Sequence, residues 1–147
     1  MSSISSNRRT VTAVVLALVV LPLPLRARPD AKDIKKPALT LKANPAVGFA
    51  PMRIFLSAEL KGGPNDYQEY YCPTVEWDWG DGTRSESTAD CEPYEAGKSE
   101  IKRRFAVEHM YRLSGIFNVQ IRLKRKEKVL VAATTTLRIQ ASIPGRN

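Results

Sequence analysis

The chain is poor in the residues that build most catalytic and metal sites, because its 147 residues include one histidine and two cysteines. A structural zinc site takes four Cys or His ligands, and His109, Cys72 and Cys91 supply only three. No serine or cysteine nucleophile can be paired with His109 from the sequence pattern. We therefore predict that the chain is not an enzyme and that it holds no metal and no cofactor.

Long apolar runs are also missing. A transmembrane helix needs about 20 apolar residues, whereas the run at 11–25 is shorter and is interrupted by Pro22 and Pro24. Arg8 and Arg9 precede the run, and small and polar residues follow it, which is the pattern of a secretory signal peptide. We expect residues 1–27 to be that signal, with an uncleaved anchor as the alternative, and residues 28–37 to be a linker. The mature chain would be secreted or periplasmic, with no membrane span.

The expected export predicts the oxidation state of the two cysteines. In an oxidising compartment, an isolated pair such as Cys72 and Cys91 is most simply one disulfide. Closing a loop of about 20 residues in this way contributes roughly 3 kcal/mol to the free energy of unfolding on the chain-entropy model.

The formal net charge of +8 is unevenly distributed along the chain. Between residues 59 and 100 there are eleven acids and three bases, and between 101 and 147 there are eleven bases and two acids. Either the two halves pack side by side and neutralise each other, or a basic face binds polyanions. An exported protein does not meet nucleic acid, so its polyanions would be anionic envelope polysaccharides or lipid headgroups.

No segment has a long helical period, and alternating apolar and polar residues recur instead. Such strand patterns occur at 39–43, 52–60, 74–79, 100–111, 117–124 and 129–139. Six or seven strands without a helix predict an all-β antiparallel sandwich, because the inward face of each strand has to be covered by a second sheet.

The segment WDWGDGT at 77–83 combines a strand end with a tight turn. Trp77 and Trp79 lie on one face of the strand, because side chains alternate along it. Gly80, Asp81 and Gly82 then supply residues that tolerate positive φ and an aspartate that can bond its own backbone. The pattern predicts a structural turn rather than a catalytic loop.

The aspartates of this segment do not form a paired-acid site. Asp78 points to the outer face of the strand and Asp81 lies in the turn, so no cleft is implied between two carboxylates. An EF-hand-like spacing fails as well, since glycines occupy the alternate positions after Asp78. A weak surface calcium site that uses Asp78, Asp81 or Asp90 stays open.

Three segments, WDWGDGT at 77–83, HMY at 109–111 and GIFNV at 115–119, together resemble the PKD domain family. The resemblance implies an immunoglobulin-like antiparallel β-sandwich of about seven strands over residues 38–141, followed by a tail at 142–147. It places His109 and Tyr111 in the turn that enters the penultimate strand, which begins near Gly115. The Tyr111 hydroxyl is expected to bond nearby backbone, as a tyrosine corner does.

Two groups of side chains are candidates for binding. Tyr67, Tyr70 and Tyr71 precede Cys72 and offer amphipathic contact area on a pinned loop. The alternative is that one or two of them fold back onto the sandwich. A basic run could contact anions, or it could be a solvated hairpin; it contains Arg122, Lys124, Arg125 and Lys126.

These features predict a non-catalytic interaction module that binds a protein or a glycan at the cell envelope or surface. Two alternatives are electrostatic binding of envelope polysaccharide or lipid headgroups through the basic strand face, and a role as accessory subunit of a secreted hydrolase. The fold does not specify a partner, and the sequence does not predict the oligomeric state.

Overall fold

A computed structural model describes residues 35–142 of the chain. The predicted signal peptide, most of the predicted linker and all but Ser142 of the predicted tail lie outside these residues. The described part contains eight strands and a short 3-10 helix, η1 (Gln68–Tyr70). The strands are β1 (Ala38–Asn44), β2 (Val47–Phe49), β3 (Met52–Lys61), β4 (Thr74–Asp78), β5 (Arg84–Thr88), β6 (Arg104–Tyr111), β7 (Gly115–Arg125) and β8 (Lys128–Gln140). Between residues 35 and 142 no helix is long and apolar enough to cross a membrane.

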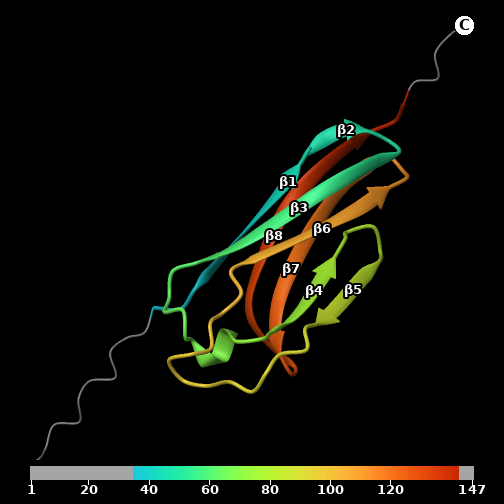
Figure 1. The fold of residues 1–147 in the computed structure, drawn as a ribbon. Helices are drawn as coiled ribbons and strands as arrows, with labels where there is room; N and C mark the ends of the chain where they lie inside the picture. The colour runs from blue at the N-terminus through green and yellow to red at the C-terminus, as the bar shows by residue number, and fades with distance from the viewer. Residues whose placement is uncertain (1–34, 143–147) are drawn as a thin grey trace, which may run out of the picture. The chain divides into compact units, whose positions relative to one another are not determined.

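The strands form two sheets that pack face to face (Figure 1). One sheet has three strands in the order β1-β3-β6, and the other has five in the order β2-β8-β7-β4-β5. All neighbouring strands are antiparallel except β2 and β8, which are parallel. This arrangement is an immunoglobulin-like β-sandwich, so the predicted fold class is confirmed.

The core lies between the sheets and follows the alternation seen in the sequence. On β3 the side chains of Ile54, Leu56, Ala58 and Leu60 are buried, while their neighbours along the strand are more exposed. The facing sheet adds further buried side chains, namely Val119, Ile121 and Leu123 of β7 and Leu137 and Ile139 of β8. Removing this apolar area from water supplies the main stabilisation of the fold.

Three details of the predicted architecture were wrong. Strands β2 and β5 were missed, because β2 has only three residues and β5, RSEST, has no apolar side chain. Both are edge strands, where alternation is weakest as a signal. The strand expected at 100–111 begins only at Arg104, because the N–H of Ile101 donates to the C=O of Asn65 instead of joining a sheet.

Candidate functional site

The two tryptophans of the WDWGDGT segment lie in the core and connect the two sheets. Trp77 and Trp79 are each 5% exposed, and their rings are stacked with centroids 5.6 Å apart. The ring of His109, on β6 of the other sheet, stacks on Trp79 at 4.2 Å between centroids. The segment is therefore part of the scaffold, as its alternation predicts.

The turn that follows is held by its own aspartates. Asp81 accepts hydrogen bonds from the N–H of Thr83 at 2.9 Å and bonds His109 Nε2 at 2.8 Å. Asp78 accepts from the N–H of Gly80 at 3.2 Å and pairs with Arg84 at 2.9 Å. Gly80 has φ of 72°, and a Cβ there would lie 2.7 Å from the carbonyl oxygen of Asn118. Both carboxylates thus have structural partners, and only glycine fits at position 80.

The hydroxyl of Tyr111 ties the two sheets together. It donates to the carbonyl oxygen of Trp79 at 2.8 Å, and the side chain is only 1% exposed. Burial raises the pKa of Tyr111, so the hydroxyl stays protonated. The expectation of a turn with a local bond was wrong, because His109 and Tyr111 belong to β6 and the acceptor is 32 residues away in the facing sheet.

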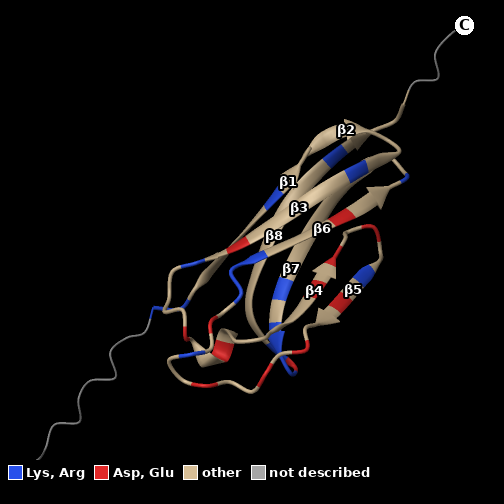
Figure 2. Ribbon diagram, in the orientation of Figure 1, with Lys and Arg blue, Asp and Glu red and all other residues tan. Residues whose placement is uncertain are grey.

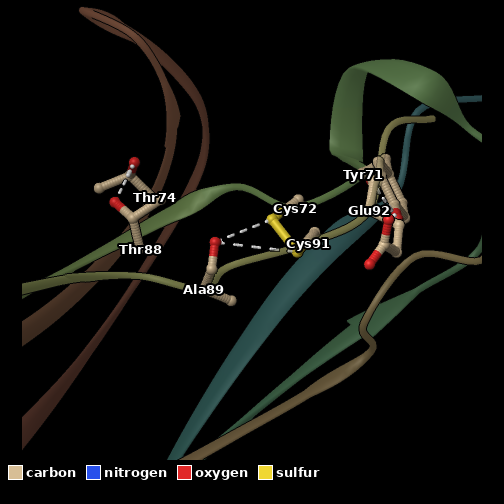
Figure 3. Close-up of a disulfide and its surroundings, with 7 residues drawn as sticks. All are labelled: Tyr71, Cys72, Thr74, Thr88, Ala89, Cys91 and Glu92. Carbon is tan, nitrogen blue, oxygen red and sulfur yellow. Dashed lines mark hydrogen bonds between the residues drawn. A yellow bond between two sulfur atoms is a disulfide. The ribbon is translucent and has the colours of Figure 1, made fainter.

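The predicted disulfide is present at the opposite end of β4. Cys72 and Cys91 are joined and are 19 residues apart in sequence (Figure 3). Beside the disulfide, the hydroxyls of Thr74 and Thr88 lie 2.9 Å apart, and Tyr71 donates to the carbonyl oxygen of Glu92 at 2.9 Å (Figure 3). The disulfide thus joins the segment that leads into β4 to the segment that leads out of β5.

The three tyrosines of the preceding loop do not form an exposed cluster. Tyr70 is 2% exposed and its hydroxyl donates to the carbonyl oxygen of Leu130 at 3.3 Å. Tyr67 is half-buried and packs on Tyr70 with ring centroids 5.1 Å apart. The contact role predicted for Tyr70 is therefore wrong, because its ring completes the core; Tyr71 alone of the three also lines a hollow in the surface.

That hollow has a volume of about 220 Å³ and lies beside the disulfide, between the edge strands β5 and β6. Its apolar walls are the disulfide itself with Pro73, Val75, Ala89 and Phe105, and its polar lining is Tyr71, Ser87, Thr88, Glu100 and Lys102. The Nζ of Lys102 lies 5.5 Å from the centroid of the Phe105 ring. The sequence did not reveal this hollow, because its lining comes from three separated segments whose proximity depends on the sandwich.

The basic run on β7 is largely neutralised by the acidic half of the chain (Figure 2). Arg122 and Lys124 both pair with Glu76 on β4, and Lys124 also pairs with Glu86 on β5 at 3.0 Å. Hydrogen bonds from Lys124 and Arg122 hold the pKa of Glu76 below its usual range. This cross-strand pairing supports the interpretation that the two halves neutralise each other.

The remaining members of the basic run behave differently. Arg125 donates to the carbonyl oxygen of Gln68, and Lys126 is an exposed residue with φ of 53° in the hairpin turn. The charges of Arg122 and Lys124, the central pair of the predicted anion-binding face, are already engaged by carboxylates, which counts against anion binding by this pair. Within residues 35–142 no group of three or more His, Cys, Asp or Glu side chains could hold a metal ion.

Comparisons with known proteins found similarity only among solved structures. No family model and no curated protein matches the chain. Solved structures with a similar fold include the PKD domain of an M14-like peptidase from a Thermoplasmatales archaeon, with 14% identity and a TM-score of 0.49 over 72% of this chain and 97% of that one. The CARDB domain of a Pyrococcus furiosus protein, in complex with di-metal ions, has 9% identity and a TM-score of 0.43 over 73% of this chain and 96% of that one.

A third similar structure is a superoxide reductase from Ignicoccus hospitalis, with 13% identity and a TM-score of 0.39 over 73% of this chain and 82% of that one. All three likenesses concern the fold alone.

The contacts of Asp81 predict a loss of stability in acid. Burial alone would raise the pKa of Asp81, but hydrogen bonds from Thr83 and His109 outweigh it and hold the pKa below its usual range. The ionised carboxylate therefore stabilises the fold above the unfolded-state pKa of about 3.9, and this contribution is lost as the pH falls through the lower folded-state value. We expect Asp81→Asn to lower the free energy of unfolding by about 1.5 kcal/mol at pH 7, and the gap to shrink below pH 4.

Denaturant unfolding of wild type and Asp81→Asn at a series of pH values from 7 to 2 measures this gap directly. Glu76 and Glu69 also have lowered pKa values, but they are present in both proteins and cancel in the difference. A gap that stays constant down to pH 2 would contradict the role given to the ionised carboxylate.

Proposed function

We propose that this chain is a non-catalytic, extracytoplasmic interaction module that binds a protein or a glycan of the cell envelope or surface. The observation that carries the proposal is the hollow beside the disulfide, about 220 Å³ in volume. It combines apolar walls with a few polar groups, which is the composition of recognition sites in general. We assign binding to this end of the sandwich.

The backbone around the hollow is held in place by covalent and hydrogen bonds. This favours binding, because little conformational entropy is lost on association. The disulfide and the pair of Thr74 and Thr88 fix β4 against β5. Arg103 donates to the carbonyl oxygens of Gly62 and Gly63 and to the side chain of Asn65, so it anchors the loop after β3. A ligand would meet a preformed surface rather than a loop that has to be ordered.

The polar groups of the hollow set the kind of partner that fits. Lys102 and Glu100 are opposite charges on one segment, and Ser87 and Thr88 add hydroxyl groups from β5. Phe105, which is 6% exposed, forms an apolar floor of the hollow. This mixture suits a neutral or mixed-charge partner better than a polyanion.

Site-specific crosslinking tests the proposal. A diazirine-bearing residue placed at Ser87, in the hollow, is expected to capture a discrete envelope protein or glycan in the cells that make the chain. The matched control is the same residue at Thr136, an exposed position of β8 that is not among the residues lining the hollow. Equal capture at both positions, or none at Ser87, would refute the assignment of binding to the hollow.

A further inference from the structure

Exposed apolar side chains gather at the end of the sandwich that is farthest from the disulfide. Seven large hydrophobic residues are exposed in the described part of the chain, and five of them lie at this end. We call these five the apolar tip: Val47, Phe49, Met110, Leu113 and Ile116. Their exposed fractions run from 41% for Met110 to 76% for Leu113. Large exposed apolar side chains gathered at one end of a domain are candidates for an interaction site.

The strand register brings these residues together. Val47 of β2 and Ile116 of β7 both lie opposite Arg138 of β8, so the three form one row across the five-stranded sheet. Leu113 lies in the short connection between β6 and β7, and Met110 is the last but one residue of β6. Figure 1 shows β2, the start of β3 and the end of β6 at this same end of the molecule.

The side chains of the tip point in several directions. Val47, Phe49 and Ile116 project from the outer face of the five-stranded sheet, because their neighbours Gly48 and Ile139 face the core. Met110 projects from the outer face of the other sheet, since the adjacent His109 points inward to Trp79. One rigid protein surface does not reach both outer faces at once, whereas a fluid bilayer surrounds them.

The charges around the tip are basic. In the segments 44–52, 79–83, 110–116 and 138–142 the charged residues are Asp81, Arg112 and Arg138. Arg53, which lies opposite Met110, pairs with Glu108 at 3.3 Å, so these two charges offset each other. Asp81 is already bonded to His109 and Thr83. Arg112 and Arg138 make no ion pair within residues 35–142, so they are available to anionic groups.

We propose that the apolar tip docks into the headgroup region of an anionic phospholipid bilayer, without spanning it. Apolar side chains that enter the interface and cations that meet anionic headgroups are the two signals that together give stable peripheral binding. Leu113 and Ile116 would enter most deeply, because they are the most exposed of the five. This docking is separate from the binding assigned to the disulfide end.

The test compares the two ends of the full chain by tryptophan fluorescence. Leu113→Trp places a tryptophan reporter in the apolar tip. Val129→Trp places the reporter near the start of β8, at the disulfide end, where the native residue is also exposed, at 47%. Both proteins are mixed with vesicles of phosphatidylcholine and phosphatidylglycerol that carry brominated acyl chains, which quench nearby indoles. Trp77 and Trp79 contribute the same background in each protein.

We expect strong quenching and a blue shift for Leu113→Trp and no change for Val129→Trp. A second pair of measurements uses Arg112→Gln/Arg138→Gln, which is expected to lose on the order of tenfold in partitioning to the anionic vesicles but not to pure phosphatidylcholine. Equal or greater quenching of Val129→Trp would overturn the proposal, because the bilayer would then contact the disulfide end of the sandwich. The absence of quenching in both proteins would also overturn it. The same holds if the tip mediates self-association of the chain without binding vesicles.

Discussion

Replacing Trp77 with alanine is expected to lower the free energy of unfolding by about 3–5 kcal/mol, the usual cost of truncating a buried tryptophan. The side chain is 5% exposed and stacks on Trp79, which in turn stacks on His109 of the facing sheet. Its loss leaves a cavity at the junction of the two sheets, where the surrounding strands cannot easily close the gap. Denaturant unfolding followed by circular dichroism measures the change.

The adjacent residue supplies the matched control. Asp78→Asn keeps the acceptor for the N–H of Gly80 and loses only the exposed ion pair with Arg84, so its cost should stay below about 1 kcal/mol. The two substitutions are one residue apart, but Trp77→Ala changes the inward face of β4 and Asp78→Asn changes its outer face. A larger loss for Asp78→Asn than for Trp77→Ala would mean that the faces of this strand are assigned the wrong way round.

Removing the disulfide is expected to cost about 3 kcal/mol, which follows from the loop that it closes. Cys72 and Cys91 are 19 residues apart, and the chain between them contains both β4 and β5. The substitution Cys72→Ser/Cys91→Ser frees the outer end of β5, an edge strand with no buried side chain. The loss is read as the difference in unfolding free energy from wild type.

Hydrogen exchange locates the effect. In the double serine variant the amides of β5 should lose protection more than those of β7, which lies inside the same sheet between two neighbours. Wild type in the presence of a reductant should behave like the variant. A uniform loss of protection across both sheets would show that the disulfide stabilises the whole fold rather than its open edge.

The fold could be predicted because its central strands follow simple alternation. On β3 and β7 apolar residues lie two apart over most of the strand, and seven of these positions are buried: Ile54, Leu56, Ala58, Leu60, Val119, Ile121 and Leu123. The two cysteines, with an expected export signal before them, were enough to predict the disulfide. The peripheral strands β2 and β5 carry little side-chain pattern, since they are held by backbone hydrogen bonds and not by burial.

The surface could not be predicted in the same way, because it depends on which strands become neighbours. Lys124 looks like a free cation in the sequence, yet the register places it beside carboxylates 38 and 48 residues away. Tyr70 looks like a loop residue, yet its hydroxyl reaches a carbonyl 60 residues further along the chain. Pairings over such sequence distances follow from the topology and leave no local signal.

The eleven residues of β7 run the length of the five-stranded sheet, from the connection beside the apolar tip to the hairpin near the disulfide end. At about 3.3 Å per residue this strand spans about 35 Å. If the apolar tip is held at a bilayer, the rigid sandwich therefore keeps the hollow at about this distance from the lipid surface. This is several times the Debye length of about 8 Å at physiological salt, so a partner would be recognised beyond the electric field of the lipid surface.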